Sequence, residues 1–254
     1  MWSRMLCGLL LMAAVSGAET LEEAVDGYLR AAEGTSKPWK ITGNLGLTVT
    51  DGNSDTLTVT AGAEGVKEWD PWKLILKISA IYAESNSVET ANEQIFKERL
   101  ERALTERSWL FQEFMLEHDE QEALSYRIQF TLGYKRQLVK REKFNLFAEA
   151  GGGVLYEKFR TTTETEGIAQ FGINFDWQIT DQLLFTQSIT IYPSLSEGGE
   201  YRFISESVFT TPIGEKLDLR FAIVDKFDSD PPAGVQENDL QITLAIVIRF
   251  TGEE

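Results

Sequence analysis

The sequence predicts an all-β fold: a transmembrane antiparallel β-barrel of about 12 strands, preceded by a short periplasmic helix. Apolar and polar residues alternate from Trp39 to Phe250 in runs of about ten to thirteen residues, the length of a membrane-crossing strand. Turn residues separate these runs, and tryptophans and tyrosines gather at opposite ends of them. Alternation gives each strand one apolar and one polar face, which suits a barrel with lipid outside and a polar lumen.

Residues 1–18 have the features of a secretory signal peptide. Arg4 is followed by an apolar stretch from Met5 to Val15 and by the small residues Ser16 to Ala18. We therefore expect cleavage after Ala18, and no later stretch is apolar for long enough to form a transmembrane helix. The single cysteine, Cys7, lies inside this segment, so the mature chain has no disulfide and no cysteine-based metal site.

Residues 19–38 form a second segment, in which the pattern changes from period two to helical spacing. Thr20 and Glu23 are spaced as a capping box, and Gly34 and Pro38 supply a helix end. The apolar face of this helix is Leu21, Ala24, Val25, Tyr28 and Leu29. We expect a periplasmic helix that acts as a tether, with a plug or a partner-docking element as the alternative.

Residues 39–254 form the predicted outer-membrane barrel domain. The expected strands are 39–50, 55–68, 72–83, 93–104, 107–117, 124–137, 143–157, 164–178, 182–193, 200–211, 215–226 and 238–250. An even number of strands brings both termini to the periplasm. Connections after even-numbered strands are short, and most of the others are longer, such as Glu84 to Asn92 and Phe227 to Glu237.

The last strand has the clearest alternation. Its apolar face is Leu240, Ile242, Leu244, Ile246, Ile248 and Phe250, and its other face is Asp239, Gln241, Thr243, Ala245, Val247 and Arg249. We expect the barrel-insertion machinery to bind this C-terminal strand. The outer surface of the barrel should contact outer-membrane lipid and lipopolysaccharide, with the protein present as a monomer.

Aromatic residues sort by strand end. Trp39, Trp69, Trp72, Trp109 and Trp177 fall at expected periplasmic ends. Tyr82, Tyr126, Tyr156, Tyr192 and Tyr201 fall at expected outer ends. Two such belts are typical of membrane interfaces, so they support the topology.

Two strands, 93–104 and 107–117, fit the alternation poorly. The residues concerned are Glu98 and Arg102 beside Phe96 and Leu100, and Glu113 between Phe111 and Met115. Charges facing lipid are unfavourable, so we expect either a bulge that switches the face or a different register.

The polar face should place charges of both signs in the lumen. The predicted lumen charges are Glu64, Lys73, Lys77, Arg127, Glu149, Glu206, Arg220 and Arg249. Confined charges must be paired, which favours a self-neutralising network that fills the lumen. A narrow pore with a charge preference is the alternative, because a barrel of about 12 strands leaves little free bore.

Residues for chemistry are scarce, and we predict no catalytic, cofactor-binding or metal-binding residues. His118 is the only histidine, and a lipid hydrolase using it with Ser125 is one alternative function. A soluble or secreted ligand-binding β-barrel is another. Asp51, Asn53 and Asp55 have the spacing of a calcium loop, but glycine at the sixth position is missing, so we interpret them as turn residues.

The chain is acidic, with a formal net charge of −16 at pH 7 and no basic patch. Nucleic acid is therefore not an expected partner. We interpret the acidity as a property of solvated loops and turns.

Several short stretches resemble the salt-induced outer-membrane protein family (YdiY-like), whose domain has no assigned function. They are Trp39 and Gly43, the turn from Gly52 to Thr56, Glu117 to Asp119 with Arg127, Gly133-Tyr134, and Glu149 with Gly151 to Gly153. The resemblance implies a barrel in the bacterial outer membrane and implies no reaction. The sequence as a whole predicts a porin-like, non-enzymatic barrel that is either structural or a low-conductance pore.

Overall fold

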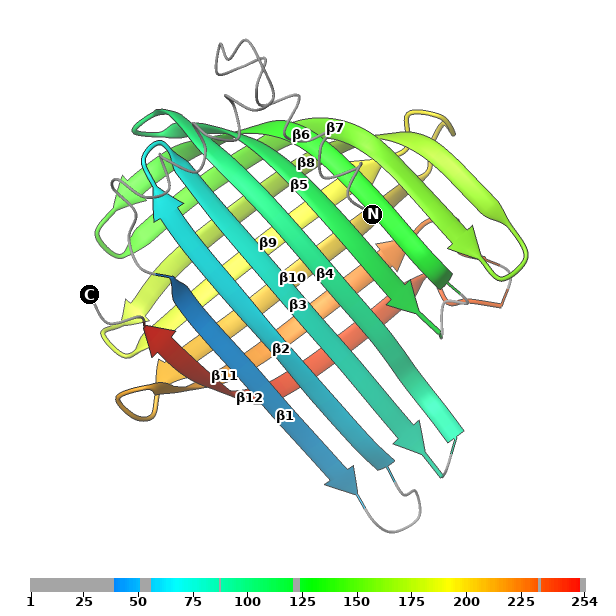
Figure 1. The fold of residues 1–254 in the computed structure, drawn as a ribbon, viewed down its shortest axis with the longest axis horizontal. Coiled ribbons are helices and arrows are strands. Elements are labelled where there is room, and N and C mark those ends of the chain that lie inside the picture. Colours follow the sequence, from blue (N-terminus) through cyan, green and yellow to red (C-terminus); the bar gives the residue numbers. More distant parts are fainter. Residues whose placement is uncertain (1–38, 51–55, 87, 121–123, 233, 252–254) are drawn as a thin grey trace, which may run out of the picture.

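The computed structural model describes residues 39–50, 56–86, 88–120, 124–232 and 234–251, and these form a closed antiparallel barrel of 12 strands (Figure 1). The strands are β1 (Lys40–Thr50), β2 (Thr56–Trp69), β3 (Trp72–Ser85), β4 (Val88–Thr105), β5 (Ser108–Asp119), β6 (Leu124–Arg141), β7 (Phe144–Phe159), β8 (Thr163–Thr180), β9 (Leu183–Pro193), β10 (Tyr201–Pro212), β11 (Leu217–Asp228) and β12 (Asn238–Thr251). Each strand pairs with the next, and β1 closes the barrel against β12. The all-β barrel and its number of strands are confirmed. The expected signal peptide and periplasmic helix lie outside the described residues.

In the described ranges, no helix is long and apolar enough to cross a membrane. We call the end of the barrel where β1 begins and β12 ends the terminus end, and the opposite end the loop end.

The connection between β3 and β4 is shorter than the sequence indicated. β3 continues to Ser85 and β4 begins at Val88, with Glu84 opposite Glu89. Asn86 has a positive φ of 50°, a left-handed conformation that asparagine tolerates well in tight turns. The expected long loop from Glu84 to Asn92 was therefore wrong, because pairing with β3 extends the strand through residues of low β-propensity.

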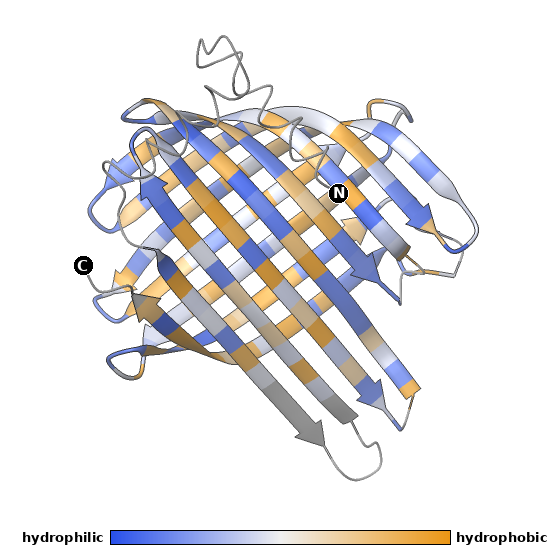
Figure 2. Ribbon diagram, in the orientation of Figure 1, coloured by the Kyte–Doolittle hydropathy of each residue, from blue (hydrophilic) through white to orange (hydrophobic). Residues whose placement is uncertain are grey.

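The outer surface carries an apolar band, and Figure 2 shows the alternation of hydrophobic and hydrophilic residues along the strands. On β12, Leu244 is 61% exposed while Val247 on the other face is 1% exposed. A row of phenylalanine rings crosses β7 to β11 with centroid distances of 4.5 to 6.4 Å: Phe144, Phe175, Phe185, Phe209 and Phe221. This row lies toward the terminus end.

A second set of aromatic contacts lies at the loop end, where Tyr126 stacks on Tyr156 and Tyr201 packs against Phe227. The two expected belts are therefore present, with two corrections. Trp109 and Tyr192 lie at the expected ends but on the lumen-facing side of their strands, where Lys135 and Arg202 pack over their rings.

The two poorly patterned strands, β4 and β5, pair in continuous register through their middle. Arg99 lies opposite Glu113, and the irregularities fall only at the strand ends. Phe111, Glu113 and Met115 face the lumen, so the interpretation of that face as membrane-facing was wrong. The outer face of β5 is formed by Leu110, Phe114, Leu116 and their neighbours at even positions.

Glu98 and Arg102 do face outward, on the same side of β4 as Phe96 and Leu100. The Gln112 Nε2 donates a hydrogen bond of 2.8 Å to the Glu98 carboxylate. The Arg102 guanidinium lies 5.6 Å from the centre of the Trp72 ring. Each outward charge therefore has a polar or aromatic neighbour on the barrel wall, which lowers the penalty of exposing it to an apolar medium.

Candidate functional site

The lumen is crossed by ion pairs between strands that are not neighbours, and these contacts identify the inward face of every strand. Lys226 of β11 reaches Glu117 of β5, and Lys77 of β3 reaches Glu206 of β10. Because side chains alternate along each strand and the register is known, the lumen lining follows from these contacts.

One side of the lumen is lined by large and charged side chains, and we call it the charged wall. It comprises the lumen faces of β4 to β7, including Arg99, Glu101, Phe111, Glu113, Met115, Glu117, Arg127, Gln129, Lys135, Glu149, Leu155 and Glu157. The opposite side is the small-residue wall, on β12, β1 and β2. Its members are Gln241, Thr243, Ala245, Val247, Thr42, Asn44, Gly46, Thr58, Thr60 and Gly62.

A mouth network of six charged residues closes part of the lumen near the loop end. Its members are Glu93, Glu117, Arg127, Glu157, Arg202 and Lys226. Arg127 binds Glu117 at 2.7 Å and also binds Glu157, while Lys226 binds Glu117 at 3.2 Å and also binds Glu93. Three cations thus face three carboxylates. The Arg127 and Glu117 side chains are only 7% and 4% exposed, so the network satisfies buried charges that would otherwise be costly.

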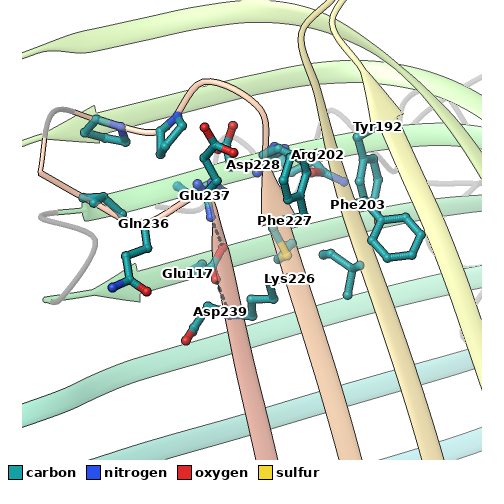
Figure 3. Close-up of a pocket in the computed structure, with 17 residues that line it drawn as sticks. Glu117, Tyr192, Arg202, Phe203, Lys226, Phe227, Asp228, Gln236, Glu237 and Asp239 are labelled. Atoms are coloured by element: carbon teal, nitrogen blue, oxygen red, sulfur yellow. Dashed lines mark hydrogen bonds and ion pairs between the residues drawn. The ribbon is translucent and has the colours of Figure 1, made fainter.

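A small cavity lies above this network, beneath the connection from β11 to β12 (Figure 3). Tyr192, Arg202 and Lys226 line it from the barrel, and Pro231, Pro232 and Val235 line it from the connection. Two backbone bonds hold the connection over the mouth: Asp228 N–H to the Glu237 carbonyl at 2.8 Å, and Ser229 N–H to the Tyr201 carbonyl at 3.1 Å.

The cavity volume is about 50 Å³. That volume holds a few water molecules, whereas pockets for organic ligands measure several hundred Å³. The mouth therefore has no room for an organic substrate in this conformation.

A second cluster, the middle network, lies deeper in the charged wall. The Arg99 guanidinium contacts three carboxylates: Glu101 at 2.9 Å, Glu113 at 3.1 Å and Glu149 at 2.8 Å. Lys135 also binds Glu101, at 2.9 Å. The Arg99 guanidinium lies over the Phe111 ring at 4.1 Å, so its charge is held by both carboxylates and a π face.

Glycine on β6 makes room for this cluster. Gly133 faces the lumen opposite Phe111, and a Cβ at Gly133 would overlap the Phe111 ring. The neighbouring Gly151 on β7 lies directly opposite Gly133. The absence of a side chain at Gly133 leaves the space that the Phe111 ring occupies under Arg99.

The small-residue wall differs from the charged wall, because none of its ten residues takes part in the ion pairs described above. The bridge that borders it near the middle of the barrel joins Lys77 Nζ to Glu206 Oε1 at 3.8 Å. These two side chains are 41% and 37% exposed, so solvent reaches the pair. The lumen is therefore filled along one wall, and solvent reaches the Lys77–Glu206 pair beside the other.

All eight charges predicted for the lumen occupy lumen-facing positions of their strands. Arg127 belongs to the mouth network, Glu149 to the middle network, and Lys77 pairs with Glu206. Arg249 lies 3.3 Å from Asp218 and donates to the carbonyl of Glu215. Glu64 lies opposite Lys77. Among the described residues, Lys73 and Arg220 are members of neither network.

Sequence reasoning missed the residues that complete both networks. Glu113 and Glu117 lie on the face of β5 that carries Phe111 and Met115, and Arg99 lies on the face of β4 opposite to Phe96 and Leu100. Lys226 precedes Phe227 near the end of β11. The charged residues at odd positions from Glu93 to Glu101 share one face of β4. This pattern is the signal that could have predicted such lumen-facing residues.

His118 contacts the backbone of Ser125 rather than its side chain. It lies on the outer face of β5, and its Nδ1 is 2.9 Å from the backbone carbonyl oxygen of Ser125 rather than its hydroxyl. Its Nε2 is 3.7 Å from the Glu120 carboxylate. Within the described ranges, no group of His, Cys, Asp and Glu side chains is arranged to hold a metal ion.

Known proteins similar to this chain include the uncharacterized protein YdiY of Escherichia coli (strain K12), which is 26% identical over 218 residues, covering 83% of this chain and 82% of YdiY. Among solved structures, the NanC porin has a TM-score of 0.47 at 8% identity, covering 84% of this chain and 98% of the porin. The KdgM porin has a TM-score of 0.42 at 8% identity, covering 84% and 99%.

The family described as "Protein of unknown function, DUF481" matches residues 43–250, which is nearly the whole barrel. Together with the similarity to YdiY, this match confirms the resemblance drawn from the short sequence stretches. The chain belongs to the DUF481 family.

Proposed function

We propose that this protein is a non-enzymatic barrel of the bacterial outer membrane that forms a narrow pore of low conductance. The observation that carries the proposal is the combination of a closed barrel, an apolar outer band and a lumen crossed by paired charges. The mature protein would contact lipid and lipopolysaccharide through its outer band.

The outer surface supports a membrane location. Ile242, Leu244 and Phe250 are each more than half exposed on one strand, and such side chains recur around the barrel. Exposed apolar patches of this extent are unfavourable in water. Aromatic rows bound the band toward both ends, as expected at two membrane interfaces.

The lumen supports a low conductance. The mouth and middle networks fill the space along the charged wall, and the β11–β12 connection lies over the mouth. Solvent reaches the lumen beside the Lys77–Glu206 pair, whose side chains are partly exposed. Porins with wide water channels have about 16 or more strands, so a narrow path is expected from the barrel size as well.

Planar-bilayer recording on the refolded protein tests the pore. We expect small, resolvable current steps, with heat-denatured protein giving none. Steps as large as those of a general porin in the same bilayers would contradict a filled lumen, and no steps at all would leave a purely structural barrel.

Cysteine labelling on intact cells tests the location and orientation. Gly198→Cys lies in the β9–β10 connection at the loop end, and Gly214→Cys lies between β10 and β11 at the terminus end. The predicted cleavage after Ala18 would remove Cys7, the single cysteine of the sequence, and with it background labelling. A membrane-impermeant maleimide should label the first variant and not the second, and the reverse pattern would invert the orientation.

The hydrolase alternative is tested by lipid hydrolysis assays on wild type and His118→Ala. We expect no activity from either. Hydrolysis by the wild type that His118→Ala abolishes would make the protein an enzyme.

A further inference from the structure

The bridges across the lumen divide it in the same way at different depths. At the mouth, Lys226 of β11 binds Glu93 of β4. Near the middle, Lys77 of β3 meets Glu206 of β10. In the closed strand order, both bridges leave β12, β1 and β2 on one side and β5 to β9 on the other. The small-residue wall is therefore separated from the charged wall along much of the barrel.

The space beside the small-residue wall has the chemistry of a hydrated path. Hydroxyl and amide groups of Thr42, Asn44, Gln241 and Thr243 face it and are half-buried, whereas Thr60, Ala245 and Val247 of the same wall are buried. The charged residues Glu64 and Arg249 lie on the same faces of β2 and β12, toward the terminus end. Short polar side chains leave room for water and bind ions weakly.

The Lys77–Glu206 bridge borders this space at mid-depth, with Glu64 of β2 opposite Lys77. Its separation of 3.8 Å and the exposure of both side chains distinguish it from the short, buried bridges of the two networks. Exposed pairs of this kind contribute little to stability, typically below about 1 kcal/mol, so the pair can separate at small cost.

We propose that small hydrated ions pass between the small-residue wall and the Lys77–Glu206 bridge, and that this bridge is the constriction that sets charge preference. The inference rests on the proposed pore function. One charge of each sign at the constriction gives the wild type weak selectivity. Removal of either charge leaves the other facing the path and favours counter-ions of the opposite sign.

Reversal potentials across a salt gradient test the constriction. Lys77→Ala should shift the reversal potential toward cation selectivity, and Glu206→Ala should shift it in the opposite direction. The double variant should conduct more than wild type with little selectivity. Lys143→Ala is the matched control, because it also removes one lysine charge but lies in an exposed turn outside the lumen, and it should leave the reversal potential unchanged.

A pair of threonines tests the path itself. Thr243→Cys lies on the small-residue wall, and Thr131→Cys lies on the lumen face of β6, where Thr131 is 0% exposed. A small charged methanethiosulfonate reagent should modify Thr243→Cys and reduce its conductance, and it should not react with Thr131→Cys. Reaction at Thr131→Cys alone would place the path along the charged wall and overturn the inference.

The two proposals fail in different ways. Absence of conductance in both wild type and the Lys77→Ala, Glu206→Ala double variant would refute the pore itself. Conductance with unchanged reversal potentials in both single variants would refute the bridge as constriction while leaving the pore intact.

Discussion

The charged wall and the small-residue wall enclose the same lumen but have different physical characters. In the charged wall, Arg99 and Arg127 each contact at least two carboxylates in nearly complete burial. On the other side, the bridge that borders the wall at mid-depth is a single long contact between half-exposed side chains. One wall is organised like a protein core and the other like a solvated surface.

This difference separates residues that maintain the fold from residues that control what passes. A buried ion pair is weak evidence for net stabilisation, but removing one partner leaves an uncompensated buried charge, which is strongly destabilising. Substitutions in the charged wall should therefore lower stability, whereas substitutions beside the hydrated path should change conduction and leave stability nearly intact.

The largest effect is expected for Arg99→Ala. This change leaves the carboxylates of Glu101, Glu113 and Glu149 without their shared cation, and only Glu101 retains Lys135. We expect a loss of about 3–5 kcal/mol in the free energy of unfolding. Urea unfolding in lipid vesicles, followed by tryptophan fluorescence, measures it.

A second variant makes this result specific to charge. Adding Glu113→Gln and Glu149→Gln to Arg99→Ala removes two of the stranded charges and should restore part of the lost stability. A triple variant that is no more stable than Arg99→Ala would show that packing over Phe111, rather than charge, dominates the middle network.

The next largest effect is expected for Gly133→Ala. The added methyl group overlaps the Phe111 ring, and overpacking of this kind costs about 1–3 kcal/mol. Gly198→Ala is the control, because no atom lies within 4 Å of a Cβ at Gly198. Combining Gly133→Ala with Phe111→Leu should destabilise by less than the sum of the single changes, and simple additivity would mean that the two positions do not share space.

The sequence predicted the architecture well because alternation on most strands has one unambiguous apolar face. On β12 the face from Leu240 to Phe250 could only point to lipid, and pairing with β11 and β1 places it there. On β5 both faces carry large apolar residues, since Phe111 and Met115 occupy one and Phe114 and Leu116 the other. Period two defines two faces but does not decide which one is inside when both are mixed.

The networks required information that no single strand carries. Lys226 and Glu117 are 109 residues apart, and Arg99 and Glu149 are 50 apart. They meet only because the barrel closes with a particular stagger between strands, which local patterning does not specify. Mixed signs in the lumen predicted that charges would pair, but not which charges would do so.

A smaller effect is expected on the other side of the lumen. Lys77→Ala breaks a single exposed bridge, so we expect a change of no more than about 1 kcal/mol in the free energy of unfolding. The same urea titration measures it beside Arg99→Ala. A loss as large as that of Arg99→Ala would erase the distinction between the two walls.

The smallest effect is expected outside the lumen, at the Lys143–Asp181 pair of the terminus-end turns. Lys143 Nζ donates to Asp181 Oδ1 at 2.9 Å, and this hydrogen bond and the charge of Lys143 hold the pKa of Asp181 below its ordinary value of 3.8. A carboxylate whose pKa is lowered in the folded state stabilises the fold at pH values above its ordinary pKa. This stabilisation is lost as the pH falls through the folded-state pKa. Both side chains are exposed, so salt screens the contribution.

At physiological salt, Asp181→Asn should therefore unfold at the same urea concentration as wild type at pH 7. At low salt, wild type should be slightly more stable at pH 7, and that advantage should vanish in acid. A pH-dependent difference that survives high salt would mean that this turn is shielded from solvent, and the contrast between filled lumen and solvated surface would then extend to the barrel ends.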